Sequence, residues 1–294
     1  MSKNKAFTLL EISIVIIAIA VAYGAFQVSK KMISNASNLV ALNQADNNWD
    51  TNSSNVTEEE ESGSSFCCPN LEANLHAWYD ASDATTVISE EGVLTWQDKS
   101  ENAFHVSQSI ANDQATHIAN SDFNNLTVFD FDGTDYFVNS SFGNIGQGAI
   151  FAVAQYAQEG GNQEQTIMEL SRNTTVNDGF SLFQQGGKHY HRHNGGDFTY
   201  SSNLSSGPHL GIFSIILDGS NMKVYRNGTY RGQKSGGTIT RNVNRLTVGA
   251  LPIVNNTSYR MKGEIAEIII FDRALDDTER GEVETYLNDK WAIY

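Results

Sequence analysis

The sequence predicts an all-β protein, a two-sheet antiparallel β-sandwich preceded by a long N-terminal transmembrane helix and followed by a short C-terminal helix. Three observations support this fold class. Short segments of alternating apolar and polar residues recur between turn signals from residue 75 onward. An apolar run lies between lysine pairs near the N-terminus. The chain has 24 glycines, 3 prolines and 10% aromatic residues, which is typical of a β core with many tight turns.

Composition and charge exclude several classes of protein. The 294 residues are 40% hydrophobic and 18% charged, which argues against a wholly disordered chain and against a polytopic membrane protein. The net charge is −15, with 34 acidic and 19 basic residues. Nucleic-acid binding requires stripes of lysine and arginine, so we expect no nucleic-acid partner. The first 31 residues hold four lysines and one glutamate, so the acidity belongs to the remainder.

Residues 7–45 predict the transmembrane helix. From Phe7 to Phe26 the segment covers about 30 Å as a helix, which is enough to cross the hydrocarbon core of a bilayer. Apolar residues at helical spacing continue it to about residue 45. Glu11 lies near the start of the apolar run, where a carboxylate needs a cationic partner.

The residues Lys5-Ala6-Phe7-Thr8-Leu9-Leu10-Glu11 resemble the N-terminal motif of type IV prepilins and type II secretion pseudopilins. The resemblance implies a leader at residues 1–6, cleaved between Ala6 and Phe7 by a prepilin peptidase that also methylates the new N-terminus of Phe7. The family usually has glycine before the cut, so Ala6 is a departure. The resemblance also implies that Glu11 pairs with the terminal amine of a neighbouring pilin or pseudopilin subunit.

The resemblance also implies where in the cell the protein is located. The precursor is expected to cross the bacterial inner membrane once, with the sandwich in the periplasm or outside the cell on a pilus or the cell surface. Residues 46–70 predict an acidic linker rich in serine and asparagine, and its run Glu58–Glu61 is most simply a solvated spacer. Three states remain open for the adjacent Cys67 and Cys68: free thiols, a bond to another chain, or a vicinal disulfide.

Residues 71–294 predict the sandwich. Turn signals such as Asp132-Gly133 and Asn227-Gly228 separate strands that we place at residues 75–81, 93–98, 126–131, 149–157, 165–171, 179–185, 188–193, 210–218, 222–228, 245–251 and 263–272. Such spacing favours two stacked antiparallel sheets. In the final segment, Asp276 is placed to cap a helix with Glu279 reaching back. One apolar face of that helix is formed by Val283, Tyr286, Leu287 and Trp291.

Five segments in this region look like the laminin-G-like branch of the concanavalin A-like superfamily: residues 75–82, 93–100, 131–136, 224–228 and 263–271. The resemblance implies a jelly-roll sandwich. This fold hosts lectins, adhesion modules, glycosidases and protease inhibitors, so it leaves the function open. Such modules often bind calcium at the rim. Aspartates lie at predicted loop edges, but each also suits a turn and we assign none as a metal ligand: Asp132, Asp135, Asp178 and Asp218.

A second metal hypothesis concerns the segment 188–193. Its alternating His189, His191 and His193 fall on one face of an extended strand, where imidazoles are able to bind a transition metal. The interpretation we favour is a solvent-facing strand with titratable histidines, in which Tyr190 points the other way into the core.

The sequence contains no motif that establishes either a catalytic site or a sugar-binding site. Retaining glycosidases need two carboxylates about 5–5.5 Å apart, and the Glu-x-Asp-x-x-Glu run of similar sandwich glucanases does not occur. Glu264 and Glu267 are three residues apart, so on a regular strand they point to opposite faces. We therefore expect no enzyme. Aromatic residues available as a sugar platform are Tyr190, Tyr200, Tyr230 and Trp96, although most aromatic residues here suit the core.

The sequence thus predicts a non-catalytic, pilin-like exported surface protein. Its N-terminal helix anchors or polymerises it, and its laminin-G-like domain is displayed for adhesion or for recognition of a glycan or a surface protein. One alternative is a structural minor pilin or pseudopilin without a ligand, in a pilus or a type II secretion system. Another is a membrane-tethered glycan hydrolase.

Overall fold

The computed structural model describes residues 68–89, 91–157, 164–172, 175–186, 188–194, 196–200, 209–252 and 259–294. The predicted leader, the transmembrane helix and all but the end of the linker lie outside these residues. Within the described residues, no helix is both long and apolar enough to span a membrane. The described chain forms two antiparallel sheets and one α-helix, α2 (Asp277–Trp291), so the predicted β-sandwich with a short C-terminal helix is confirmed.

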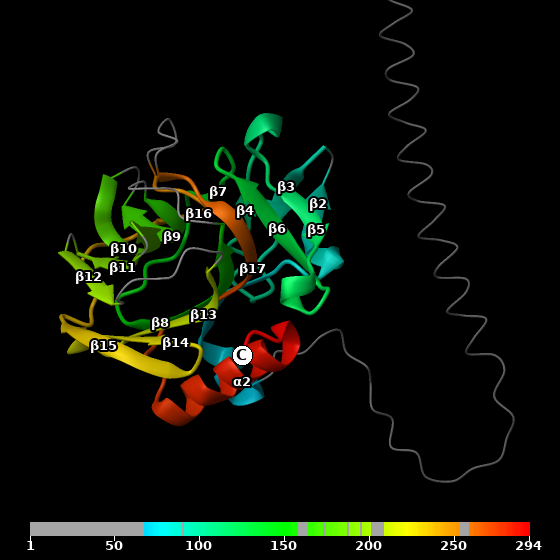
Figure 1. Ribbon diagram of the computed structural model, residues 1–294. Coiled ribbons are helices and arrows are strands. Elements are labelled where there is room, and N and C mark those ends of the chain that lie inside the picture. Colours follow the sequence, from blue (N-terminus) through cyan, green and yellow to red (C-terminus); the bar gives the residue numbers. More distant parts are fainter. Residues whose placement is uncertain are drawn as a thin grey trace, which may run out of the picture. The chain divides into compact units, whose positions relative to one another are not determined.

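An 8-stranded sheet packs against α2 (Figure 1). Its strands follow the order β15-β14-β13-β8-β17-β6-β5, and β1 also pairs with β17. The bounds are β1 (Leu75–Asp80), β5 (Thr116–Ala119), β6 (Thr127–Asp132), β8 (Gly148–Tyr156), β13 (His209–Leu217), β14 (Asn221–Arg226), β15 (Thr229–Ser235) and β17 (Lys262–Phe271).

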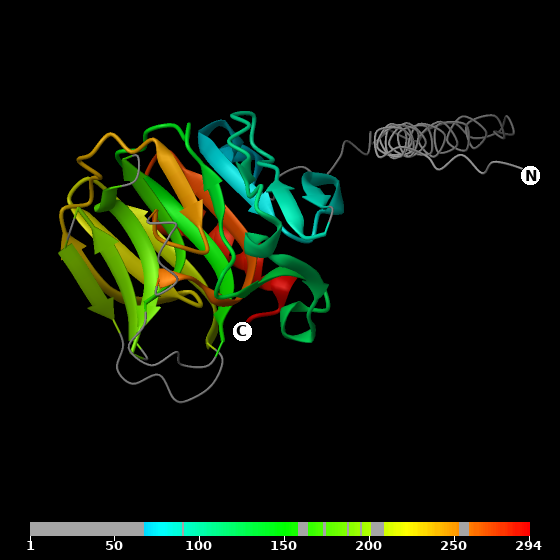
Figure 2. The same ribbon diagram turned by 90° about the horizontal axis from the view of Figure 1, so that it is seen from above.

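A 9-stranded sheet forms the other layer, in the order β12-β11-β10-β9-β16-β7-β4-β3-β2 (Figures 1 and 2). Its bounds are β2 (Val87–Ser89), β3 (Val93–Trp96), β4 (Val106–Ser107), β7 (Phe137–Asn139), β9 (Gln165–Arg172), β10 (Thr175–Gln185), β11 (Lys188–His193), β12 (Gly196–Tyr200) and β16 (Arg245–Val248). A short 3₁₀ helix, η1 (Pro69–Asn74), precedes β1, and others connect strands at η2 (Ala84–Thr86), η3 (Ala111–Asp113) and η4 (Ser121–Phe123).

The central strands of the 8-stranded sheet are buried on both faces. Along β8, Ile150 and Ala152 enter the inner core between the sheets, whereas Phe151 and Val153 enter an outer core beneath α2. Every residue of β8 is therefore buried, and its sequence is almost continuously apolar rather than alternating. The 9-stranded sheet has a different pattern, because its outward residues are largely polar.

The helix α2 is built as predicted. Asp276 accepts hydrogen bonds from the backbone N–H groups of Thr278 and Glu279, and the Glu279 carboxylate accepts one from the Asp276 N–H. This capping box satisfies N–H groups that have no partner within the helix. Val283, Leu287 and Trp291 fill the outer core.

A β-bulge changes the prediction for the two glutamates of β17. The register with β8 shifts between Ile265 and Glu267, so Glu264 lies opposite Gln155 and Glu267 opposite Val153. On a regular strand, residues three apart point to opposite faces. The extra residue of a bulge shifts this alternation by one, so residues on either side of it that are three apart point to the same face. Both glutamates consequently lie on the outer face, and the prediction that they point to opposite faces was wrong.

Candidate functional site

The histidines of β11 lie on the inner face, so the prediction of a solvent-facing strand was wrong. His189, His191 and His193 are buried, whereas Tyr190 is partly exposed on the outer face, where it stacks on Phe183 at 5.1 Å. The pairing with β10 explains this inversion. His191 lies opposite Leu182 and His193 opposite Phe180, and residues that pair across strands share a face.

The imidazoles of His189 and His191 pack as aromatic core residues. The ring of His191 stacks on Phe180 at 6.2 Å, and the ring of His189 lies 5.0 Å from that of Phe213. Burial lowers the pKa of His191 to about 3 and lowers that of His189 well below its usual value. The described part of the chain contains no group of three or more histidine, cysteine or acidic residues able to hold a metal. The structure therefore brings the three histidines to one face but not to one metal centre.

The other sequence candidates are dispersed. Asp135 is buried and accepts a hydrogen bond from the N–H of Asp132, and Asp218 pairs with Lys223 at 3.0 Å; these carboxylates shape turns. Asp178 lies within β10 rather than at a loop edge. Cys68 is disulfide-bonded, so the free-thiol state is not the one adopted, and the sequence offers one other cysteine, Cys67.

Of the aromatic candidates, Trp96 is fully buried in the inner core. Tyr200 ends β12. Tyr230 is 51% exposed on the edge strand β15 and makes an edge contact with Tyr225. Tyr190 lies on the outer face of the 9-stranded sheet, whereas Tyr230 belongs to the 8-stranded sheet and Trp96 is buried, so these three residues do not form one platform.

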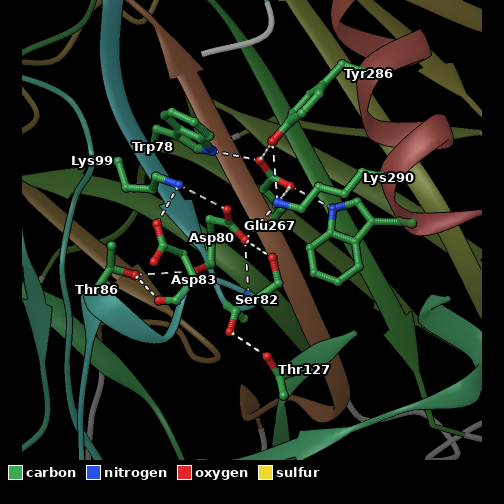
Figure 3. Close-up of polar contacts among 12 residues, drawn as sticks. Trp78, Asp80, Ser82, Asp83, Thr86, Lys99, Thr127, Glu267, Tyr286 and Lys290 are labelled. Atoms are coloured by element: carbon green, nitrogen blue, oxygen red, sulfur yellow. Dashed lines mark hydrogen bonds and ion pairs between the residues drawn. The ribbon is translucent and has the colours of Figure 1, made fainter. Parts of the chain in front are cut away.

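A cluster of buried charges lies between the 8-stranded sheet and α2 (Figure 3). Glu267 is 0% exposed and accepts four hydrogen bonds, from both indole N–H groups of Trp78 and Trp291, the Tyr286 hydroxyl and the Lys290 ammonium, at 2.6–2.9 Å. Its burial raises the pKa of Glu267, and Lys290 opposes that rise.

The cluster continues through Asp80. The Lys290 ammonium lies 2.8 Å from the Asp80 carboxylate. The Lys99 ammonium lies between two aspartates, 3.2 Å from the carboxylate of Asp80 and 2.8 Å from that of Asp83. Burial tends to raise the pKa of Asp80, but Lys290, Ser82 and Lys99 outweigh it, so the pKa is lowered. Because the Glu267 carboxylate is enclosed by its four donors, we assign the cluster to fastening α2, β1 and β17 together rather than to chemistry.

A polar groove of about 550 Å³ lies on the 9-stranded sheet, and we call it the sheet groove. It opens where β4, β7 and β16 lie side by side. Its lining residues are His105, Ser107, Gln108, Ser109, Tyr136, Val138, Asn139, Ser140, Ser141 and Arg245.

Strand register puts the floor of the sheet groove on the outer face. Phe137 of β7 and Leu246 of β16 enter the inner core, so their neighbours Val138 and Arg245 point outward. Cross-strand pairing continues this outward row across the sheet, through mostly polar residues: Thr95, Ser107, Val138, Thr247, Glu169, Ser181 and Arg192. The polar face contrasts with the apolar outer face beneath α2.

Hydrogen bonds fix the groove side chains before any ligand arrives. The buried Gln108 amide donates to the carbonyl of Tyr136 at 3.2 Å and accepts from the N–H of Ile110 at 2.9 Å. Asn139 donates to the carbonyl of His105 at 2.8 Å. The guanidinium of Arg260 lies 4.3 Å from the centre of the Tyr136 ring. Such support holds the lining in one geometry.

Sequence patterns did not reveal the sheet groove. Its residues come from three distant segments, 105–109, 136–141 and 245, and β4 and β7 are too short for a periodic signal. The sequence feature that could have indicated the groove is its serines, at positions 107, 109, 140 and 141. Alone, however, a serine in such a position indicates a turn as readily as a binding surface.

Comparison with known proteins supports the fold but not a family. No family model matches the chain. No curated protein matches it either. Similar solved structures include the binding domain of Paraclostridial Mosquitocidal Protein 1, at 14% identity over 74% of this chain and 53% of that one, with a TM-score of 0.50. A mutant of HCR/D is 14% identical over 74% of this chain and 52% of that one, with a TM-score of 0.53.

The binding domain of botulinum neurotoxin serotype D/C gives 12% identity over 74% of this chain and 53% of that one, with a TM-score of 0.48. The chain thus spans about half of each of these solved chains. At such identities the likeness to the two structures with TM-scores of 0.50 and 0.53 establishes a shared β-sandwich fold alone.

Proposed function

We propose that the sandwich recognises a glycan at the sheet groove and that a pilin-like N-terminal segment displays it outside the cell. The observation that carries the proposal is the groove itself: an open, preorganised, polar depression on the sheet face opposite the one that α2 covers. Sugars present hydroxyl groups in fixed directions. A rigid set of hydroxyl, amide, imidazole and guanidinium groups matches that pattern.

The fold comparison supports a binding role. Two similar structures with TM-scores of at least 0.50 are the binding domain of a mosquitocidal protein and a mutant of HCR/D. The first is named for binding, and this chain shares its sandwich fold.

The test for glycan recognition is a glycan array probed with the full-length protein in detergent. We expect Ser107→Trp to abolish binding, because its indole fills the floor of the groove. Thr229→Trp, on the exposed edge strand β15, is the matched control and should bind as the natural protein does. Failure of the natural protein to bind any glycan would instead favour a structural minor pilin or pseudopilin, or a protein ligand.

The pilin part of the proposal rests on the motif around Ala6, Phe7 and Glu11, which lies outside the described residues. It implies a prepilin peptidase as processing partner and other pilin or pseudopilin subunits as assembly partners. Mass spectrometry of the mature N-terminus tests it directly. We expect a chain that begins at methylated Phe7, and a chain that retains Met1 contradicts the proposal.

We also propose that the protein is not a hydrolase. The bulge puts Glu264 and Glu267 on one face, but Glu267 is fully buried and enclosed by four donors, which leaves it no access to a sugar. Release of reducing sugars from any glycan that binds on the array, sensitive to Glu264→Gln, would contradict this.

A further inference from the structure

The charge that lines the sheet groove is opposite in sign to the net charge of the protein. The chain carries 34 acidic and 19 basic residues. Among the described residues, the groove lining nevertheless contains the guanidinium of Arg245 and neither aspartate nor glutamate. Binding of a neutral ligand does not require a positive charge in the groove, because serine and amide groups already provide hydrogen bonds to it.

Arg245 is a cation without a counter-ion in the described structure. Its Nη1 donates to the Ser140 hydroxyl at 3.2 Å and its Nε to the Thr247 hydroxyl at 3.3 Å, and no carboxylate among the described residues forms an ion pair with it. Arg192, Arg273 and Arg280, by contrast, each pair with a glutamate. Burial lowers the pKa of Arg245, and the nearby Tyr136 opposes that shift.

Two carboxylates close to the groove segments in the chain are already engaged by backbone N–H groups. Asp98 accepts hydrogen bonds from the N–H groups of Trp78, Ser100 and Phe104 at 2.8–2.9 Å. Asp135 accepts one from the N–H of Asp132 at 2.8 Å. These bonds direct both carboxylates to the backbone, and neither residue lines the groove.

His105 offers a second hydrogen-bond donor in the groove. The Nδ1 of His105 accepts a hydrogen bond from the N–H of Asp98 at 3.0 Å, so the ring proton of the neutral imidazole sits on Nε2. His105 is exposed, which leaves this N–H available to a ligand. The amides of Gln108 and Asn139 are occupied by backbone groups. The groove thus combines a guanidinium, an imidazole N–H and serine hydroxyls.

We propose that the sheet groove binds the anionic group of an acidic glycan, a carboxylate or a sulfate ester, with Arg245 as its direct partner and His105 as a second donor. The inference rests on the proposed glycan recognition and names the class of glycan. A guanidinium and a planar oxyanion form charge-assisted hydrogen bonds that are shorter and stronger than neutral ones.

Three polymers as probes separate the possible sources of charge. Dextran is neutral, dextran sulfate adds sulfate to the same backbone, and hyaluronan carries carboxylates only. Binding is measured by calorimetry with the full-length protein in detergent at two salt concentrations. We expect at least one anionic polymer to bind ten times more tightly than dextran, and comparison of the two anionic polymers identifies the preferred group.

Variants assign the effect to the groove. Arg245→Gln is expected to weaken anionic binding about tenfold or more, and Arg245→Lys less. Arg231→Gln removes the same charge from the exposed edge strand β15 and should change little, which controls for general attraction to a polyanion. Ser140→Asp keeps Arg245 but supplies an internal carboxylate, and it should weaken anionic binding as Arg245→Gln does, whereas Ser235→Asp on β15 should not.

The outcomes distinguish this inference from the proposed function. If dextran binds as tightly as the anionic polymers and Ser107→Trp abolishes all binding, glycan recognition stands and the anionic class is wrong. Equal loss of binding in Arg245→Gln and Arg231→Gln also overturns the inference, because the attraction is then not local to the groove. If no glycan binds at all on the array or in solution, both proposals fail.

Discussion

Glu267 shows how a single buried carboxylate is kept within an apolar layer. An isolated buried charge is costly, and its retention depends on partners that satisfy each lone pair. Here two indoles, a phenol and an ammonium supply them, from β1 and from the C-terminal end of α2. One side chain therefore fastens the helix to the sheet.

Glu267→Gln should lower the free energy of unfolding by about 3–5 kcal/mol, because an amide nitrogen then faces donors and Lys290 loses a buried partner. Urea denaturation measures the change. Glu264→Gln, on the same face but half-buried and hydrogen-bonded to Asn120 at 3.3 Å, is the matched control and should cost less than about 1 kcal/mol. Equal effects at the two positions would show that burial within the cluster is unimportant.

The buried histidines predict acid sensitivity. Burial holds the pKa of His191 at about 3 and that of His189 well below 6.5, and the charges of Arg226, His209 and Arg231 add to the effect at His189. In the unfolded chain these imidazoles take up protons below about pH 6.5, whereas in the folded protein they do not. Their contribution to stability is therefore present above pH 6.5 and is lost as the pH falls below it.

We expect stability to fall by up to about 1.4 kcal/mol per pH unit for each such histidine below pH 6.5. His191→Phe should reduce the loss of stability between pH 7.5 and pH 5, as measured by urea denaturation at both values. His105→Phe, at an exposed position, provides the comparison. An unchanged pH difference in His191→Phe would contradict the assignment.

At the scale of elements, strands with a strong pattern were predictable and short or polar ones were not. Each predicted strand occurs, and the C-terminal helix begins at its predicted cap. The missed strands are β2, β4, β5, β7, β12 and β15. Two of them, β4 and β7, have two and three residues, and β15 is an exposed edge strand without an apolar face. Neither kind produces a periodic signal.

The direction of side chains was harder to predict than the presence of strands. Alternation along β11 correctly put three histidines on one face, but periodicity does not say which face is buried. The histidines face the core because they lie opposite Phe180 and Leu182, which point inward from the neighbouring strand. In β17, the bulge after Ile265 reversed the expected relation between two glutamates. Both corrections come from pairing between strands, which a single sequence does not display.

Gly281 gives a prediction for α2. A Cβ built at this position meets no atom within 4 Å, and glycine within a helix is less stable than alanine by about 1 kcal/mol. Gly281→Ala should therefore raise the free energy of unfolding by about that amount. Gly148→Ala in β8 should do the opposite, since its Cβ would lie 2.5 Å from the carbonyl oxygen of Phe271. Thermal unfolding followed by circular dichroism tests both changes.

At the scale of the whole molecule, the two sheets differ in what covers them. The outer face of the 8-stranded sheet is apolar and is closed by α2, whereas the outward row of the 9-stranded sheet is mostly polar. This difference was only partly visible in the sequence. The continuous apolar runs of β8 and β17 indicate burial on both faces, but the sheet groove forms where Arg245 meets segments that lie more than a hundred residues earlier in the chain.

Removal of α2 should therefore disrupt the entire sandwich. A stop codon at position 276 would expose Trp78, Phe151, Ile269 and their apolar neighbours, a surface that soluble domains do not tolerate. We expect the truncated protein to bind a hydrophobic dye strongly and to lose cooperative thermal unfolding. A monomeric product that unfolds cooperatively would show that the outer core is dispensable.

The position of Cys68 has a consequence for geometry. This first described residue packs in the outer core, on the α2 side, while the sheet groove lies on the opposite layer. Residue 68 is therefore held on the α2 side of the sandwich. Stacked sheets lie about 10 Å apart, so a ligand bound in the groove, as we propose, would be separated from this point of the chain by both layers.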